Sequence, residues 1–145
     1  MKWLTELRLE VTRAPGYFTT VLYNDVVVEK GVTSGRPVWE IAPQSIIVAP
    51  AAGDRIPLRH CQVWGWAWSA VPVESVEISV DGGQTWSKTE LQPRDGFSWQ
   101  RFAWDWMPSA KGAHQLICRA TDARADVQPD RDARNAVLRL EIFVT

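Results

Sequence analysis

Residues 63–86, VWGWAWSAVPVESVEISVDGGQTW, constrain the fold more than any other part of the chain. Three tryptophans alternate here with small residues: Trp64, Trp66 and Trp68. Because successive strand side chains point to opposite faces, this predicts a strand with one aromatic face and one face suited to close sheet contact. Residues 76–80 also alternate, and the Asp-Gly-Gly at 81–83 predicts a turn, since glycine adopts positive φ without steric cost.

Short β-prone runs recur along the rest of the chain, separated by Gly, Pro and polar residues, and no amphipathic helix is predicted. The predicted strand-forming segments are 3–11, two runs within 17–28, 38–42, 45–48, 58–69, 76–80, 85–91, 97–106, 113–121 and 136–144. Residues 31–35 and 122–135 are predicted loops. This spacing indicates an all-β fold, an immunoglobulin-like antiparallel β-sandwich over residues 44–145 with an N-terminal extended arm or linker over residues 1–43.

Size and charge exclude several classes of partner. A chain of 145 residues is expected to form one domain. Its net charge is −1, with charges of both signs interspersed, so the sequence lacks the basic excess typical of nucleic-acid-binding proteins. No apolar run reaches membrane-spanning length, and the first residues lack a signal-peptide core. The sequence does not indicate a cellular compartment.

Nine tryptophans are more than one small core is expected to fill. We expect Trp86 and Trp99 in the core, with Trp39 as an anchor for its own segment. Five tryptophans are candidates for an interface with a second subunit or another domain: Trp64, Trp66, Trp68, Trp104 and Trp106. The alternative is a carbohydrate-binding β-sandwich that stacks sugars on these rings.

The sequence predicts no catalytic or metal site. His60 and His114 with Cys61 and Cys118 fit no known metal-ligand spacing and are interpreted as ordinary strand residues. The two cysteines could form an intersheet disulfide, but two buried free thiols are favoured. Asp81 is interpreted as the residue that caps its own turn rather than as a catalytic acid.

Several motifs together resemble the C-terminal dimerisation domain of the sulfite oxidase family of molybdenum oxidoreductases. They are Lys2-Trp3-Leu4, Gly16-Tyr17-Phe18, Leu22-Tyr23-Asn24, residues 44–50 (QSIIVAP), 65–69 (GWAWS), 76–80, 81–86 (DGGQTW), 97–106, 118–122 (CRATD) and 127–129 (VQP). After Pro129 the sequence departs from the family, whose Trp-Asn and glycine are absent before the last strand.

The resemblance implies a non-catalytic assembly domain that forms a homodimer. It implies a molybdopterin-binding domain upstream, where a cysteine thiolate holds molybdenum and arginines bind the oxyanion, in a parent enzyme that oxidises sulfite or a related oxyanion. No cofactor is expected in this chain. By this resemblance, Lys2 corresponds to a position that contacts the pterin in the family, and it is interpreted here as a vestige of that cofactor site.

Overall fold

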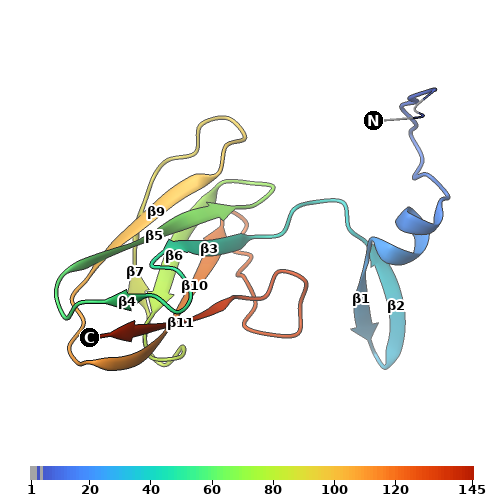
Figure 1. The fold of residues 1–145 in the computed structure, drawn as a ribbon. Coiled ribbons are helices and arrows are strands. Elements are labelled where there is room, and N and C mark those ends of the chain that lie inside the picture. The colour runs from blue at the N-terminus through green and yellow to red at the C-terminus, as the bar shows by residue number, and fades with distance from the viewer. Residues whose placement is uncertain (1–2, 4) are drawn as a thin grey trace. The chain divides into compact units, whose positions relative to one another are not determined.

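The computed structural model describes residue 3 and residues 5–145 and divides the chain into two compact units, residues 1–40 and 41–145 (Figure 1). In chain order the elements are η1 (Phe18–Leu22), β1 (Asn24–Glu29), β2 (Val32–Pro37), β3 (Gln44–Ala49), β4 (Arg55–Ile56), β5 (Cys61–Trp68), β6 (Val73–Ser79), β7 (Ser87–Lys88), β8 (Glu90–Leu91), β9 (Gln100–Trp106), β10 (Gly112–Asp122) and β11 (Arg139–Val144). Within the described residues, no helix is long and apolar enough to cross a membrane.

The second unit is a sandwich of two sheets, which confirms the predicted all-β fold class. One sheet has four strands in the order β3-β5-β9-β8, and the other has five in the order β4-β11-β10-β6-β7 (Figure 1). All pairings are antiparallel except that between β4 and β11, which is parallel. The sandwich is therefore mixed at one edge.

The core lies between the sheets and is filled by alternating residues from both. Fully buried side chains of the four-stranded sheet include Val63, Ala67 and Phe102, and those of the five-stranded sheet include Ile78 and Leu116. The inward faces of β5 and β6 are therefore those predicted from sequence alternation.

Gly65 explains why β5 carries small residues on its inward side. A Cβ at this position would lie 1.9 Å from the Ile46 carbonyl oxygen and 2.6 Å from Cζ of Phe102. Only glycine leaves room for β3 to approach this closely, where the register shifts between Ile47 and Ala49.

The return strand predicted over residues 85–91 is divided between the two sheets. β7 pairs with β6 in one sheet, and β8 pairs with β9 in the other. Between them, Thr89 donates from its backbone N and its Oγ1 to the Val76 carbonyl, both at 3.0 Å. A single run of β-prone residues thus crosses from one layer to the other, which alternation alone does not indicate.

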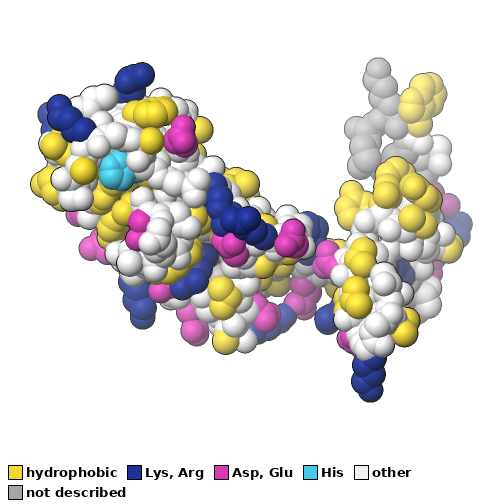
Figure 2. Space-filling model, turned by 90° about the horizontal axis from the view of Figure 1, so that it is seen from below, with side chains coloured by type: hydrophobic (Ala, Val, Ile, Leu, Met, Phe, Trp, Pro, Cys, Tyr) yellow, Lys and Arg dark blue, Asp and Glu magenta, His cyan; other side chains and the backbone are white. Residues whose placement is uncertain are grey.

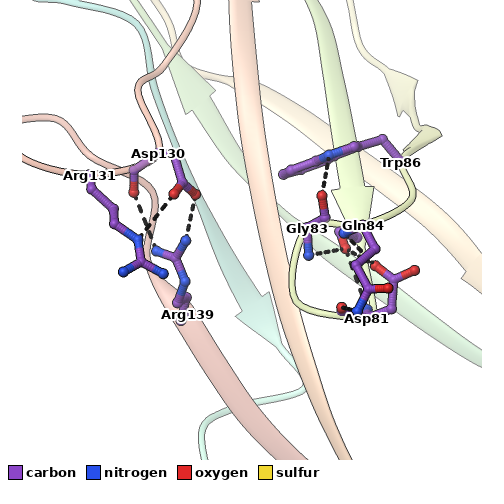
Figure 3. A network of polar contacts seen from close by, with 8 residues as sticks. Asp81, Gly83, Gln84, Trp86, Asp130, Arg131 and Arg139 are labelled. Atoms are coloured by element: carbon purple, nitrogen blue, oxygen red, sulfur yellow. Dashed lines mark hydrogen bonds and ion pairs between the residues drawn. The ribbon is translucent and has the colours of Figure 1, made fainter.

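The turn after β6 is closed by the carboxylate of Asp81, as predicted (Figure 3). Asp81 accepts hydrogen bonds from Ser79 Oγ at 2.7 Å, from the backbone N of Gln84 at 3.0 Å and from Thr85 Oγ1 at 2.6 Å. These donors hold the pKa of Asp81 well below its ordinary value, chiefly through the Thr85 hydroxyl. The carboxylate is thus a structural cap, with its oxygens occupied by the turn.

A second carboxylate in Figure 3, Asp130, lies in the long loop before β11. Arg139 of β11 donates to it, and Arg131 forms an ion pair with it at 3.2 Å. Hydrogen bonding by Arg139 lowers the pKa of Asp130. The loop predicted over residues 122–135 therefore has defined anchors although the described part contains no strand beyond Asp122.

The first unit differs most from the sequence predictions. The segment 31–35 is predicted as a loop, but residues 32–35 belong to β2, which pairs with β1 across a two-residue turn. Lys30 and Gly31 both have positive φ, at 50° and 79°, as a tight hairpin turn requires. Residues 18–22, predicted as extended, form the π-helical turn η1.

Two further expectations for the first unit are wrong. Within 3–11, the described residues contain no strand, because no neighbouring strand supplies hydrogen bonds to their backbone. Trp39, expected as an anchor, is 72% exposed, with the Arg13 guanidinium 5.3 Å from its ring centroid. Arg13 also donates to the Tyr23 carbonyl at 2.8 Å. No described residue of this unit is buried, and hydrophobic side chains are visible on its surface in Figure 2.

Candidate functional site

The outward face of the four-stranded sheet gathers most of the residues that the sequence singled out. Strand alternation and the pairing register place these side chains on it: Gln44 and Ile46 of β3, Gln62, Trp64, Trp66 and Trp68 of β5, Glu90 of β8, and Arg101, Ala103 and Asp105 of β9. We call this set the outer face. The three β5 tryptophans are half-buried, whereas their strand neighbours Val63 and Ala67 are fully buried in the core.

The aromatic part of the outer face is built from ring contacts across and beyond β5. Trp68 stacks on Trp99, with ring centroids 4.3 Å apart and planes inclined by 18°. Trp64 and Trp66 meet edge to face at 6.4 Å, and the Arg101 guanidinium lies 4.8 Å from the Trp64 ring centroid. One ring face of Trp68 and one of Trp64 are thus covered by these neighbours, and the rings form no coplanar platform.

The polar part of the outer face lies beside β8. Asp105 faces His60, with Nε2 of the histidine 3.3 Å from a carboxylate oxygen, and Gln62 Nε2 donates to Asp105 at 3.5 Å. A recess of about 310 Å³ opens here, lined by Gln62, Lys88, Thr89, Glu90, Ala103, Trp104 and Asp105. Glu90 and Asp105 give it two carboxylates against the single cation of Lys88.

In the sandwich, four tryptophans occupy different places from those predicted. Trp106, an interface candidate, is only 5% exposed and belongs to the hydrophobic core, and Trp104 packs partly buried against that core. Both share the inward side of β9 with Phe102, whose register partner is the buried Gly65. Trp106 is therefore no longer a candidate for an interface contact. Trp104 lines the wall of the recess.

The two tryptophans expected in the core lie outside it. Trp99 is 53% exposed and stacks on Trp68. Trp86 is half-buried, with its indole N–H donating to Gly83 O at 3.1 Å and the Arg119 guanidinium 4.0 Å from its ring centroid. Trp86 thus fixes the Asp81 turn, and Trp99 extends the aromatic part of the outer face.

Among the described residues, no group of three or more His, Cys, Asp or Glu side chains is placed to hold a metal ion. Lys2, the one predicted vestige of a cofactor contact, lies outside the described residues.

Cys61 and Cys118 are free thiols, as the sequence favoured, but of the two only Cys118 is buried as expected, and Cys61 is half-buried. Burial raises the pKa of Cys118 to about 11, against a small opposing effect of a hydrogen bond with Ser45. A thiol with such a pKa stays protonated at neutral pH and is a poor metal ligand.

Sequence reasoning found the three tryptophans of β5 but missed Trp99 and Arg101 as their neighbours. The signal for the β5 residues is local, because alternation assigns them to one face. The contacts of Trp99 and Arg101 depend on the register between β5 and β9, which one sequence does not specify.

Comparison with known proteins identifies the family of this chain. Residues 36–141 match the Mo-co oxidoreductase dimerisation domain. Sulfite oxidase from Gallus gallus is 32% identical over 100 residues, covering 64% of this chain and 22% of the relative, and mitochondrial sulfite oxidase from Homo sapiens is 30% identical over 131 residues, covering 77% and 24%. The chain thus spans about a quarter or less of the length of these relatives.

A solved structure shares the fold. The sulfane dehydrogenase SoxCD from Paracoccus pantotrophus superposes with a TM-score of 0.72 at 22% identity, over 87% of this chain and 36% of that chain. In the matched family the Mo cofactor is bound by another domain. The chain therefore belongs to the Mo-co oxidoreductase dimerisation domain family, as a dimerisation domain that is similar in sequence to part of sulfite oxidase.

Proposed function

We propose that this chain forms a homodimer through the outer face of its four-stranded sheet. The observation that carries the proposal is the aromatic part of that face, where Trp64, Trp66, Trp68 and Trp99 lie half-buried or exposed outside a core that is complete without them. Exposed aromatic surface of this kind is typical of interfaces, and in a twofold dimer each ring contributes twice. Family membership supports dimerisation itself.

In this proposal residues 1–43 connect the sandwich to an upstream molybdopterin-binding domain of the parent protein. The sandwich then holds two such domains in a fixed twofold arrangement and performs no chemistry itself. The parent is proposed to oxidise sulfite or a related oxyanion with its molybdenum cofactor. Sequence similarity to sulfite oxidases supports that part of the proposal.

The carbohydrate-binding alternative is less well supported by the ring geometry. A sugar platform needs aromatic faces that are open and roughly coplanar. Trp64 and Trp66 are inclined by 80°, Arg101 covers one face of Trp64, and Trp99 covers one face of Trp68. Titration with oligosaccharides, followed by tryptophan fluorescence, is expected to give no response; a saturable change would favour the alternative.

Light scattering on the purified chain tests the dimer. We expect twice the monomer mass of 16.4 kDa at micromolar concentration. Trp66→Glu places a charge in the centre of the aromatic part and is expected to give a folded monomer, because burying an unpaired carboxylate costs several kcal/mol (about 3 or more). Trp39→Glu is the matched control, since Trp39 is exposed and lies in the first unit. A wild-type monomer at high micromolar concentration would contradict the proposal.

A further inference from the structure

The charges on the outer face are arranged symmetrically about one cross-strand row. In the centre of the row Ala103 of β9 pairs with Trp64 of β5 on one side and with Glu90 of β8 on the other. Two residues before Ala103 lies Arg101, and two residues after it lies Asp105. All three point outward, because they share the side of β9 opposite to the buried Phe102.

Arg101 and Asp105 are thus equally distant from the row, in opposite directions along β9. At roughly 3.4 Å per residue, their Cα atoms are about 14 Å apart. Among the outward positions of β3, β5, β8 and β9, Arg101 is the one cation, and the carboxylates Glu90 and Asp105 lie at or beyond the row. The face therefore has a cationic aromatic half and an acidic half.

Two simple twofold arrangements bring two copies of such a face together. If the axis runs along β9, each residue faces its own equivalent, so Arg101 meets Arg101 of the partner subunit and Asp105 meets Asp105 of the partner subunit. If the axis runs along the row through Ala103, the two β9 strands cross antiparallel, and Arg101 meets Asp105 of the partner subunit twice, while Glu90, which lies in the row, meets Glu90 of the partner subunit once. Opposite charges attract across an interface and like charges repel. The second arrangement is favoured, because it sets two attractive pairs against one repulsive pair, whereas the first has two repulsive pairs.

The acidic half offers a recess to an arginine. The recess beside β8 has a volume of about 310 Å³ and is lined by both carboxylates and by Lys88, so two carboxylates stand against one cation. Asp105 is exposed, and His60 and Gln62 approach the same carboxylate oxygen, Oδ1, at 3.3 and 3.5 Å, so Oδ2 stays available for a stronger partner. Small Ala103 in the centre lets the two sheets approach closely.

Resting on the proposed homodimer, we infer that Arg101 of each copy pairs with Asp105 of the other, inside the recess that Glu90 helps to line. The twofold axis then crosses the strands at Ala103 and Trp64. The aromatic half of one copy covers the acidic half of its partner, with Trp66 facing Gln62 of the partner subunit. The paired charges set the register of the interface, and the aromatic rings supply most of its apolar contact.

Charge exchange in the full chain tests the pairing. Arg101→Glu and Asp105→Arg, each alone, place like charges opposite one another twice in every homodimer. We expect each to weaken dimerisation by about tenfold or more in sedimentation equilibrium, as close charge pairs at interfaces do. Mixing the two variants restores dimers, since the heterodimer holds one native pair and one exchanged pair. The double variant Arg101→Glu/Asp105→Arg also dimerises.

Lys111→Glu is the control, because Lys111 is exposed and lies outside the four strands of this face. Thermal unfolding of each variant separates misfolding from dissociation. In the Arg101→Glu/Asp105→Arg variant, the contact between the Arg101 guanidinium and the Trp64 ring is still lost. Recovery of dimerisation in that variant therefore reports the pairing between positions 101 and 105.

Each outcome has a definite meaning. Dimeric single variants beside a dimeric wild type overturn the pairing and leave the homodimer intact. Weakened single variants whose mixture stays dissociated also overturn it. A monomeric wild type overturns the proposed dimer and the pairing together.

Discussion

The side-chain amide of Gln100 pairs with the backbone of Val73 as a neighbouring strand would. Val73 N donates to Gln100 Oε1 at 2.7 Å, and Gln100 Nε2 donates to the Val73 carbonyl at 2.9 Å. Gln100 begins β9 in the four-stranded sheet and Val73 begins β6 in the five-stranded sheet, and both are buried. One side chain thus joins the two layers and helps to fix the position of the outer face relative to the core.

Gln100→Ala is expected to destabilise the sandwich by about 3 kcal/mol, because two buried backbone groups lose a partner. Chemical denaturation, analysed as a two-state transition, measures the change in the free energy of unfolding. Gln92→Ala is the control, since the Gln92 side chain is exposed and only its carbonyl accepts a bond from Gln100. Equal stability of the two variants would contradict the role of the Gln100 amide.

Gly65→Ala is expected to cost about 3 kcal/mol, because the added Cβ would overlap the Ile46 carbonyl oxygen and force β3 away from β5. The midpoint of urea unfolding measures this loss. Gly16→Ala adds the same methyl group where nothing lies within 4 Å, and it should leave the midpoint unchanged. A tolerated alanine at position 65 would show that β3 has another way to pair.

Asp81→Asn is expected to lower the melting temperature at pH 7, because the amide cannot accept the bonds of Gln84, Thr85 and Ser79 as a carboxylate does. The Asp81 pKa is depressed in the folded state, so its contribution to stability is full above the unfolded-state value, about 4. It is lost as pH falls below that value and through the folded-state pKa.

The difference in melting temperature between wild type and Asp81→Asn should therefore shrink as pH falls below about 4. Asp54→Asn serves as a comparison, since Asp54 also accepts a bond in a turn, from Ala51 N at 2.8 Å, but accepts fewer bonds than Asp81. A difference that is independent of pH would show that the Asp81 charge does not matter.

The thiol of Cys118 is expected to react much more slowly with a disulfide reagent at pH 8 than that of Cys61. Cys118 is buried and its pKa is raised to about 11, whereas Cys61 is half-buried. In the Cys61→Ser variant only the slow reaction should remain, and unfolding in guanidinium should make it fast. Rapid reaction of the folded Cys61→Ser protein would contradict the burial of Cys118.

The raised pKa of Cys118 also has a consequence for stability. Its contribution is complete below the unfolded-state thiol pKa, about 8.5, and is lost as pH rises toward 11. Between pH 7 and 10, the wild type should lose more unfolding free energy than Cys118→Ala. If both proteins lose the same unfolding free energy over this pH range, groups other than Cys118 cause the loss.

Local sequence patterns were sufficient to predict the fold class, the inward faces of β5, β6 and β10, and the Asp81 turn. The reason is that these features are local: alternation over a few residues assigns faces, and Asp-Gly-Gly specifies its own turn geometry. The same local pattern identified Trp64, Trp66 and Trp68 as outward residues.

Only the tertiary structure decided which other residues join them. Trp104 and Trp106 fit an outward pattern as well as an inward one, and their side of β9 is fixed by pairing with β5 at Cys61 and Val63. Residues 85–91 are divided between two sheets because β7 pairs with β6 and β8 pairs with β9. The hairpin of β1 and β2 likewise depends on pairing between two strands, across a turn. Register and layer are properties of contacts between strands, so a single strand's sequence cannot specify them.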